Sequence, residues 1–221
     1  MAIFPTDPSG GISGTDKAAG VGADKVLIAD SEDGGKGKTL PLDKIIPRGW
    51  RDITGQITVR GTGANNPNWA NIGGNFWGYN FDIGDECFMA FHVPHDYIPS
   101  TDIYFHTHWL TKNTDTTNEV WWQFEFMYAK GFDQEAFNTA GVTPTPAKQA
   151  SGAQFQHMVA ETAAVTIAAL TEPDGIIYTR VSRVTNGATD VANGQVFLLT
   201  ADIHYESDSQ ATLNKAPNFY T

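Results

Sequence analysis

From Arg51 onward, short runs of β-branched and aromatic residues alternate with polar turn sequences. Several runs alternate apolar with polar positions, which is the pattern of a half-buried β-strand. The predicted strands are residues 56–60, 76–81, 86–93, 102–109, 119–128, 155–160, 164–170, 175–184 and 196–206. No segment carries an apolar stripe at helical spacing beyond a turn or two. The pattern therefore predicts an all-β fold, a jelly-roll-like antiparallel β-sandwich over residues 49–221.

Residues 1–48 have a different character and form a predicted N-terminal attachment region. Residues 1 to about 20 are rich in Gly, Ser, Thr and Pro, which is typical of an extended arm that orders only against a partner. Val26, Leu27 and Ile28 predict a short strand, "SEDGGKGK" a turn, and "TLPLDKII" a return strand. A single small hairpin is not stable alone, so we expect it to contact a larger partner.

Two segments are longer than a hairpin connection needs. They are residues 61–74, "GTGANNPNWANIGG", and residues 129–152. Loops of this length in a compact domain usually contact something or carry a function, so both are candidates for subunit or partner contacts. The alternative is that both are surface loops.

Several predicted strands place large aromatic residues on both faces. Trp121 and Trp122 are adjacent, so one of them faces away from the core. Such faces are covered by another subunit or bind a ligand. The predicted subunit interface comprises Val26, Leu27, Ile28, Tyr104, His106, His108, Trp121 and Tyr178. The alternative is a glycan-binding surface that contains Trp69, Trp77 and Trp121.

The segment "DIYFHTHW" places His106 and His108 on one face of a predicted strand, ~7 Å apart. That spacing permits joint metal ligation if a third ligand comes from a neighbouring strand. The strand at residues 196–206 offers His204 and Asp202, on the face opposite Leu199.

His106, His108 and His204 are therefore metal-ligand candidates. The cupin motif is not met, because Ser100 stands where cupins have Gly and the next Glu after the pair is Glu119. We therefore predict no metal and no other cofactor, and expect these histidines to form a polar surface.

Charge and motifs exclude several function classes. Acidic residues outnumber basic ones 25 to 14 and the net charge is −11, which does not suit a nucleic-acid partner. The N-terminal sequence has no signal-peptide pattern and no apolar run reaches membrane length, so neither export by a cleaved signal nor a membrane partner is expected. Nucleophile-elbow and phosphate-loop motifs are missing, and the single Cys87 lies in an apolar strand. We expect no enzyme.

Three segments carry a family resemblance. The run "AFHVPHDYIPSTDIYFHTHW" and the tail "ADIHYESDSQATLNKAPNFYT" resemble a group of tailed-phage virion proteins with a jelly-roll-like domain. The segment "GADKVLIADSEDGGKGKTLPLDKI" is similar to the N-terminal hairpin of many phage fibre and appendage proteins. The resemblance implies a structural component of the particle, commonly a homotrimer, and supplies no catalytic residues.

Three hypotheses follow. The leading one is a capsid decoration (cement) protein of the virion, assembled in the host cytoplasm, which clamps capsid subunits through its N-terminal arm. Its partners would be copies of itself and the major capsid protein, or tail proteins if it belongs to the tail. The second hypothesis is a tail fibre or tail-tip protein that binds a host surface glycan. The third is a metal-dependent jelly-roll enzyme that uses His106 and His108.

Overall fold

The computed structural model describes two units of the chain. Contacts group residues Trp50–Ser207 into one unit, and Met1–Gly49 with Asp208–Thr221 into the other. The described residues are 25–30, 34–41, 48–61, 63–114, 116–132, 135–137, 139–145, 148–149, 153–185, 189–208, 212, 214–215 and 219. The predicted arm at residues 1–20 lies outside them. The described part of the chain holds no helix long and apolar enough to cross a membrane.

The predicted N-terminal hairpin is confirmed. Strands β1 (Lys25–Asp30) and β2 (Lys36–Pro41) pair antiparallel. Gly34 and Gly35 adopt φ angles of 64° and 78°, which residues with a Cβ rarely take. The double glycine therefore fixes the turn, and the second strand begins before the predicted "TLPLDKII".

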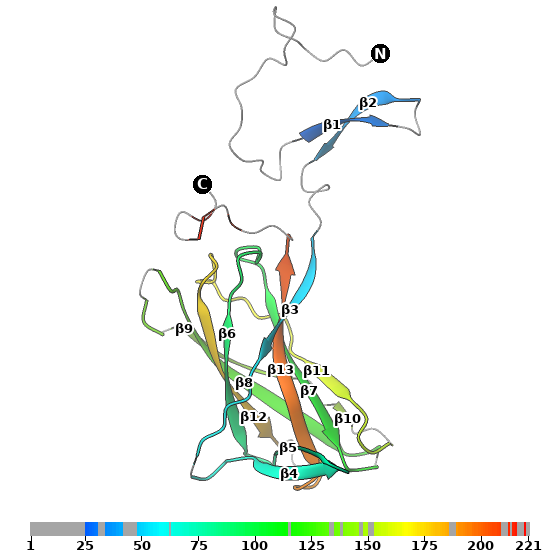
Figure 1. The fold of residues 1–221 in the computed structure, drawn as a ribbon, viewed down its shortest axis with the longest axis vertical. Helices are drawn as coiled ribbons and strands as arrows, with labels where there is room; N and C mark the ends of the chain where they lie inside the picture. The colour runs from blue at the N-terminus through cyan, green and yellow to red at the C-terminus, as the bar shows by residue number, and fades with distance from the viewer. Residues whose placement is uncertain are drawn as a thin grey trace, which may run out of the picture. The chain divides into compact units, whose positions relative to one another are not determined.

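The larger unit is an antiparallel β-sandwich, as predicted (Figure 1). The first sheet has the order β10-β8-β12-β6, with β9 also paired to β8. The second has the order β11-β7-β13-β5-β4, with β3 also paired to β13. The first sheet contains β6 (Glu86–His92), β8 (Glu119–Ala129), β9 (Thr139–Pro144), β10 (Lys148–Gln149) and β12 (Ile176–Val184). The second contains β3 (Gly49–Gly55), β4 (Asn68–Gly73), β5 (Phe76–Asn80), β7 (Ile103–Thr111), β11 (Met158–Glu161) and β13 (Val196–Ser207).

Aromatic rings from the two sheets form the centre of the core. Phe105 of β7 stacks on Phe124 of β8, with ring centroids 4.8 Å apart, and meets Phe91 of β6 edge-on at 6.4 Å. All three side chains are fully buried. Inward- and outward-facing positions alternate along each strand, so every second side chain lies on the outer face of its sheet.

The structure differs from the predicted strand pattern in two ways. Residues 56–60 and 164–170 form only isolated bridges, Thr58 to Phe88 and Val165 to Ile103. Conversely, the two long segments predicted as loops contain β4, β9 and β10. β4 and β9 are rich in Gly, Asn, Thr and Ala, and their pairing with β5 and β8 outweighs their weak intrinsic strand preference.

Candidate functional site

Histidines and carboxylates from neighbouring strands meet on the outer face of the second sheet. His106 of β7 lies between Glu161 of β11 and Asp202 of β13, which are its register partners on either side. His204 of β13 pairs in register with Tyr104 of β7. Side chains in register on adjacent strands point the same way, about 5 Å apart at Cβ. The sheet itself therefore brings these groups together.

His106 and Asp202 form the buried part of this cluster. His106 is only 6% exposed; its Nε2 contacts Glu161 Oε2 and its Nδ1 lies 3.5 Å from Asp202 Oδ1. The other carboxylate oxygen of Asp202 lies 3.0 Å from Nε2 of His108. Asp202 Oδ1 is buried and has no hydrogen-bond partner among the described residues. A buried carboxylate oxygen without a hydrogen bond is costly, and the contact of this atom with His106 Nδ1 is long at 3.5 Å.

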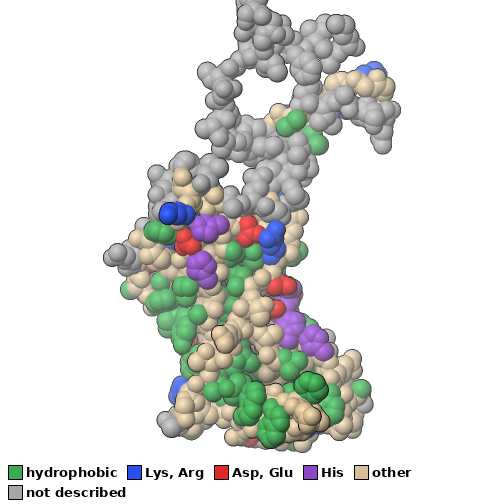
Figure 2. Space-filling view, viewed as in Figure 1, with side chains coloured by type: hydrophobic (Ala, Val, Ile, Leu, Met, Phe, Trp, Pro, Cys, Tyr) green, Lys and Arg blue, Asp and Glu red, His purple; other side chains and the backbone are tan. Residues whose placement is uncertain are grey.

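More exposed histidines and carboxylates surround His106 and Asp202. The ring of His204 lies 3.6 Å from that of His106 between centroids, and its Nδ1 is 3.5 Å from Glu161 Oε2. The Nε2 atom of His204 pairs with Asp52 of β3. His157 stacks on His108 and places its Nε2 2.8 Å from His108 Nδ1. We call these seven residues the histidine cluster: Asp52, His106, His108, His157, Glu161, Asp202 and His204. Figure 2 shows histidine and acidic side chains next to each other at this edge of the sandwich.

A cavity of about 380 Å³ opens beside the histidine cluster. Trp50, Tyr104, Glu161 and His204 line it. The Trp50 and Tyr104 rings meet edge-on, with centroids 5.4 Å apart. The cavity is therefore lined by two aromatic rings and two cluster residues, a composition typical of ligand pockets.

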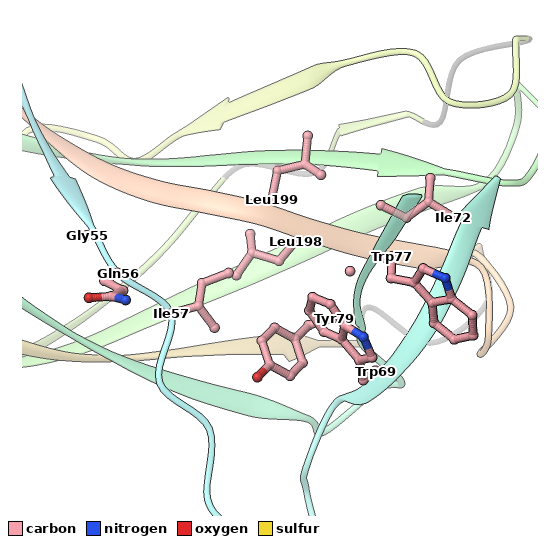
Figure 3. A pocket seen from close by; sticks show the side chains of 10 residues that line it. Gly55, Gln56, Ile57, Trp69, Ile72, Trp77, Tyr79, Leu198 and Leu199 are labelled. Carbon is pink, nitrogen blue, oxygen red and sulfur yellow. The ribbon is translucent and has the colours of Figure 1, made fainter. Parts of the chain in front are cut away.

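A second concave surface lies on β4 and β5. It has a volume of about 370 Å³, and we call it the aromatic groove (Figure 3). Trp69 and Trp77, which line it, are 60% and 53% exposed. Trp69 packs edge-on against Tyr79, with ring centroids 4.9 Å apart. Figure 2 shows hydrophobic side chains gathered over this end of the sandwich. Exposed tryptophans of this kind mark a binding surface.

A β-bulge in β13 shapes the aromatic groove. The pairing with β7 shifts between Leu198 and Thr200, so one extra residue enters the strand. Leu198 consequently packs in the core, whereas Leu199 is 41% exposed and lines the groove. The expectation that Leu199 faces the side opposite Asp202 by simple alternation therefore fails at this point.

The structure brings together all three predicted metal-ligand candidates, His106, His108 and His204. Sequence reasoning missed Glu161, because the predicted strand at residues 155–160 ends one residue too early. The alternation of His157 and Glu161 in "HMVAE" carried the signal. Asp52 was also missed, because nothing in the sequence indicates that β3 lies beside β13.

The predicted interface residues lie on several surfaces. Tyr104 lines the cavity beside the histidine cluster, and Trp121 is half-buried on β8 of the other sheet. Tyr178 of β12 is 41% exposed and stacks on Phe88. Val26 of β1 is exposed, and the side chains of Leu27 and Ile28 lie outside the described part.

The three tryptophans predicted for glycan binding do not lie on one surface. Trp69 and Trp77 share the aromatic groove, and Trp121 does not line it.

Cys87 is fully buried, and burial raises the pKa of its thiol, which disfavours the reactive thiolate. This agrees with the interpretation of Cys87 as a packing residue.

Comparisons with protein-family models and with curated proteins find no match for the chain. The function proposed for these surfaces therefore depends on their own chemistry and on the resemblance described above.

Proposed function

We propose that the chain is a structural protein of a tailed-phage particle, a capsid decoration protein that assembles as a homo-oligomer, commonly a trimer in the proteins it resembles. The observation that supports oligomerisation is the number of large apolar side chains that are exposed on more than one face of the sandwich. These side chains are far more exposed than core residues: Trp50, Trp69, Phe76, Trp77, Met127, Phe132, Phe137, Phe155, Tyr178 and Leu199. Surfaces of this kind in a β-sandwich are usually covered by a partner.

The outer face of the first sheet is one candidate contact surface between copies. Tyr178 lies opposite Met127 of β8 in register, and both side chains are well exposed. Beside them Phe88 lies under the guanidinium of Arg60, 5.5 Å from its ring centroid. An apolar centre with a charged rim is the usual composition of a subunit interface. Under the proposal, the N-terminal arm and hairpin bind the major capsid protein and the sandwich binds copies of itself.

Light scattering coupled to size-exclusion chromatography tests the oligomeric state of the full chain. We expect a mass three times the 24.0 kDa of one chain. Tyr178→Glu, which would bury a charge in the contact, should shift the equilibrium toward monomer. Val159→Glu, which adds the same charge at an exposed position of β11 in the other sheet, serves as the control. A monomer at all concentrations contradicts a homo-oligomeric decoration protein.

The copy number in purified particles tests the location. Quantitative mass spectrometry against the major capsid protein should find the chain at hundreds of copies per particle if it decorates the capsid. A few copies per particle would instead indicate a tail appendage. Absence from washed particles contradicts the proposal of a virion protein.

The aromatic groove supports a second candidate function, a tail fibre or tail-tip protein that binds a host surface glycan. Trp69 and Trp77 present exposed indole faces beside Tyr79, and sugar rings stack on such faces. Gln56 also lines the groove and adds a polar side chain. The combination of stacking faces and hydrogen-bonding groups suits a neutral saccharide.

A glycan array probed with the full chain tests this second function. Trp69→Ala and Trp77→Ala should each weaken binding roughly tenfold, because each removes one stacking face. Trp50→Ala is the matched control, since Trp50 is 55% exposed and does not line the aromatic groove. Equal loss in all three variants, or no binding by the unmodified chain, contradicts glycan recognition by the groove.

A further inference from the structure

We propose that the histidine cluster binds one divalent transition-metal ion through three side chains, His106, Glu161 and His204. One ligand atom from each lies within 4.8 Å of those of the other two. His106 Nε2 and His204 Nδ1 both face Oε2 of Glu161. Two imidazoles and one carboxylate form a common ligand set of zinc centres that keep an open position.

The backbone holds these ligands in place before any ion arrives. His106, Glu161 and His204 come from β7, β11 and β13, which are adjacent strands of one sheet. None of the three lies on a loop, so binding an ion orders little additional chain. A site held on rigid elements loses less entropy on binding than a site held on loops.

Each imidazole ligand also has a carboxylate at its other nitrogen. Asp202 Oδ1 lies 3.5 Å from Nδ1 of His106, and Asp52 pairs with Nε2 of His204. Metal-binding histidines usually donate their second N–H to such a carboxylate, which fixes the tautomer and directs the free lone pair at the metal. The pattern occurs twice here, once for each histidine.

The Asp202 carboxylate faces His106 without completing a hydrogen bond to it. The Asp202 side chain is only 8% exposed, and its Oδ1 has no hydrogen-bond partner among the described residues. A metal on the far side of His106 would position the ring and make its N–H a firmer donor to this oxygen. The ion would thereby relieve an unsatisfied buried group.

A second set of residues, His106, His108 and Asp202, also has ligand atoms within 4.8 Å of one another. It uses the opposite nitrogen of His106, so an ion there competes with the first site for the same ring. We favour the first set because Glu161 and His204 line the cavity, which provides an entry path. The second set also has a histidine, His157, at the far nitrogen of His108 in place of a carboxylate.

The chemistry of the ligands selects the class of ion. Imidazole nitrogens suit Zn²⁺ and neighbouring transition metals, whereas Mg²⁺ and Ca²⁺ prefer oxygen ligands throughout. Three protein ligands leave a position for water or an anionic group. Glu161 and His204 line the cavity together with Trp50 and Tyr104, so such a group would enter from the cavity. The proposal is independent of the virion function.

The test is zinc titration of the full chain after removal of bound metal with a chelator. Isothermal titration calorimetry and elemental analysis should find one Zn²⁺ per chain. Glu161→Gln and His204→Ala should weaken Zn²⁺ binding at least 100-fold, and Asp202→Asn about 10- to 100-fold. His92→Ala is the matched control, because His92 lies beside Asp174 and outside the histidine cluster, and its Zn²⁺ affinity should stay within about threefold. Co²⁺ in place of Zn²⁺ should give visible absorption bands that disappear in His204→Ala.

Three results would overturn the proposal. One is the failure of the folded, unmodified chain to retain stoichiometric Zn²⁺ after desalting. Another is loss of binding in His108→Ala with binding retained in His204→Ala, which would place the ion in the alternative set. The third is loss only in His92→Ala, which would assign the ion to the separate pair His92 and His95 beside Asp174. Circular dichroism melting of every variant separates loss of ligands from loss of fold.

Discussion

Trp122→Ala is expected to lower the free energy of unfolding by about 3 to 5 kcal/mol. Trp122 is fully buried on the inward face of β8, and its ring meets that of Phe81 edge-on at 5.4 Å between centroids. Truncation removes the indole and leaves a cavity that the two rigid sheets close only in part. Urea denaturation of the full chain at fixed protein concentration measures the loss, with an unchanged m-value expected.

Trp121→Ala is the matched control, because it removes the same atoms from the neighbouring position. Trp121 is half-buried and points away from the core, so its loss should cost less than half as much. In a homo-oligomer that uses this face, Trp121→Ala would change the mass measured by light scattering more than the stability of the subunit. Equal destabilisation by the two variants contradicts the inward and outward assignment of the pair.

The two tryptophans illustrate which features of the fold were predictable from sequence. Alternation along a strand is a local property, so the inward and outward positions of β7, β8 and β12 follow from the sequence alone. Strands with little apolar content, such as β4 and β9, were not predictable. They exist because a stronger neighbour pairs with them, and pairing partners are not visible in a local pattern.

The same distinction applies to the histidine cluster. The shared face of His106 and His108, and the candidacy of His204, followed from alternation. The partners Glu161 and Asp52 depend on the order of strands in the sheet, which places β11 beside β7 and β3 beside β13. The two strands of each pair lie far apart in the sequence. The full ligand set is therefore visible only from the order of strands in the sheet.

Arg183→Leu is the other variant expected to have a large effect, about 3 kcal/mol of lost stability. Arg183 occupies an inward position of β12 and is fully buried. Its Nη1 donates to the carbonyl of Phe81 at 2.8 Å, and its Nη2 donates to the carbonyl of Val191. Burial lowers the pKa of Arg183 to about 10, so the side chain stays charged at neutral pH.

The loss has two sources. Leucine leaves the carbonyls of Phe81 and Val191 without these donors, and each unpaired buried carbonyl costs about 1 to 3 kcal/mol. It also removes the cation whose charge offsets Asp82, Asp85 and Asp190. Arg183→Lys keeps the charge but has one nitrogen in place of a fork, so an intermediate loss is expected. Arg180→Leu on the same strand should cost less than half as much, because the side chain is 40% exposed and its buried partner Glu86 keeps its ion pair with Arg60.

Trp122 and Arg183 should not act independently, because they are register partners and both contact Phe81. The conservative changes Trp122→Phe and Arg183→Lys keep the protein folded enough for a double-mutant cycle. Once one change weakens the packing of Phe81, the other change removes less stabilising interaction. The loss of unfolding free energy in the double mutant should therefore be smaller than the sum of the two single losses by about 0.5 to 3 kcal/mol. Strict additivity in urea denaturation would mean that Phe81 does not couple the ring packing to the buried guanidinium. In that case the end of the sandwich would be held by two separate interactions.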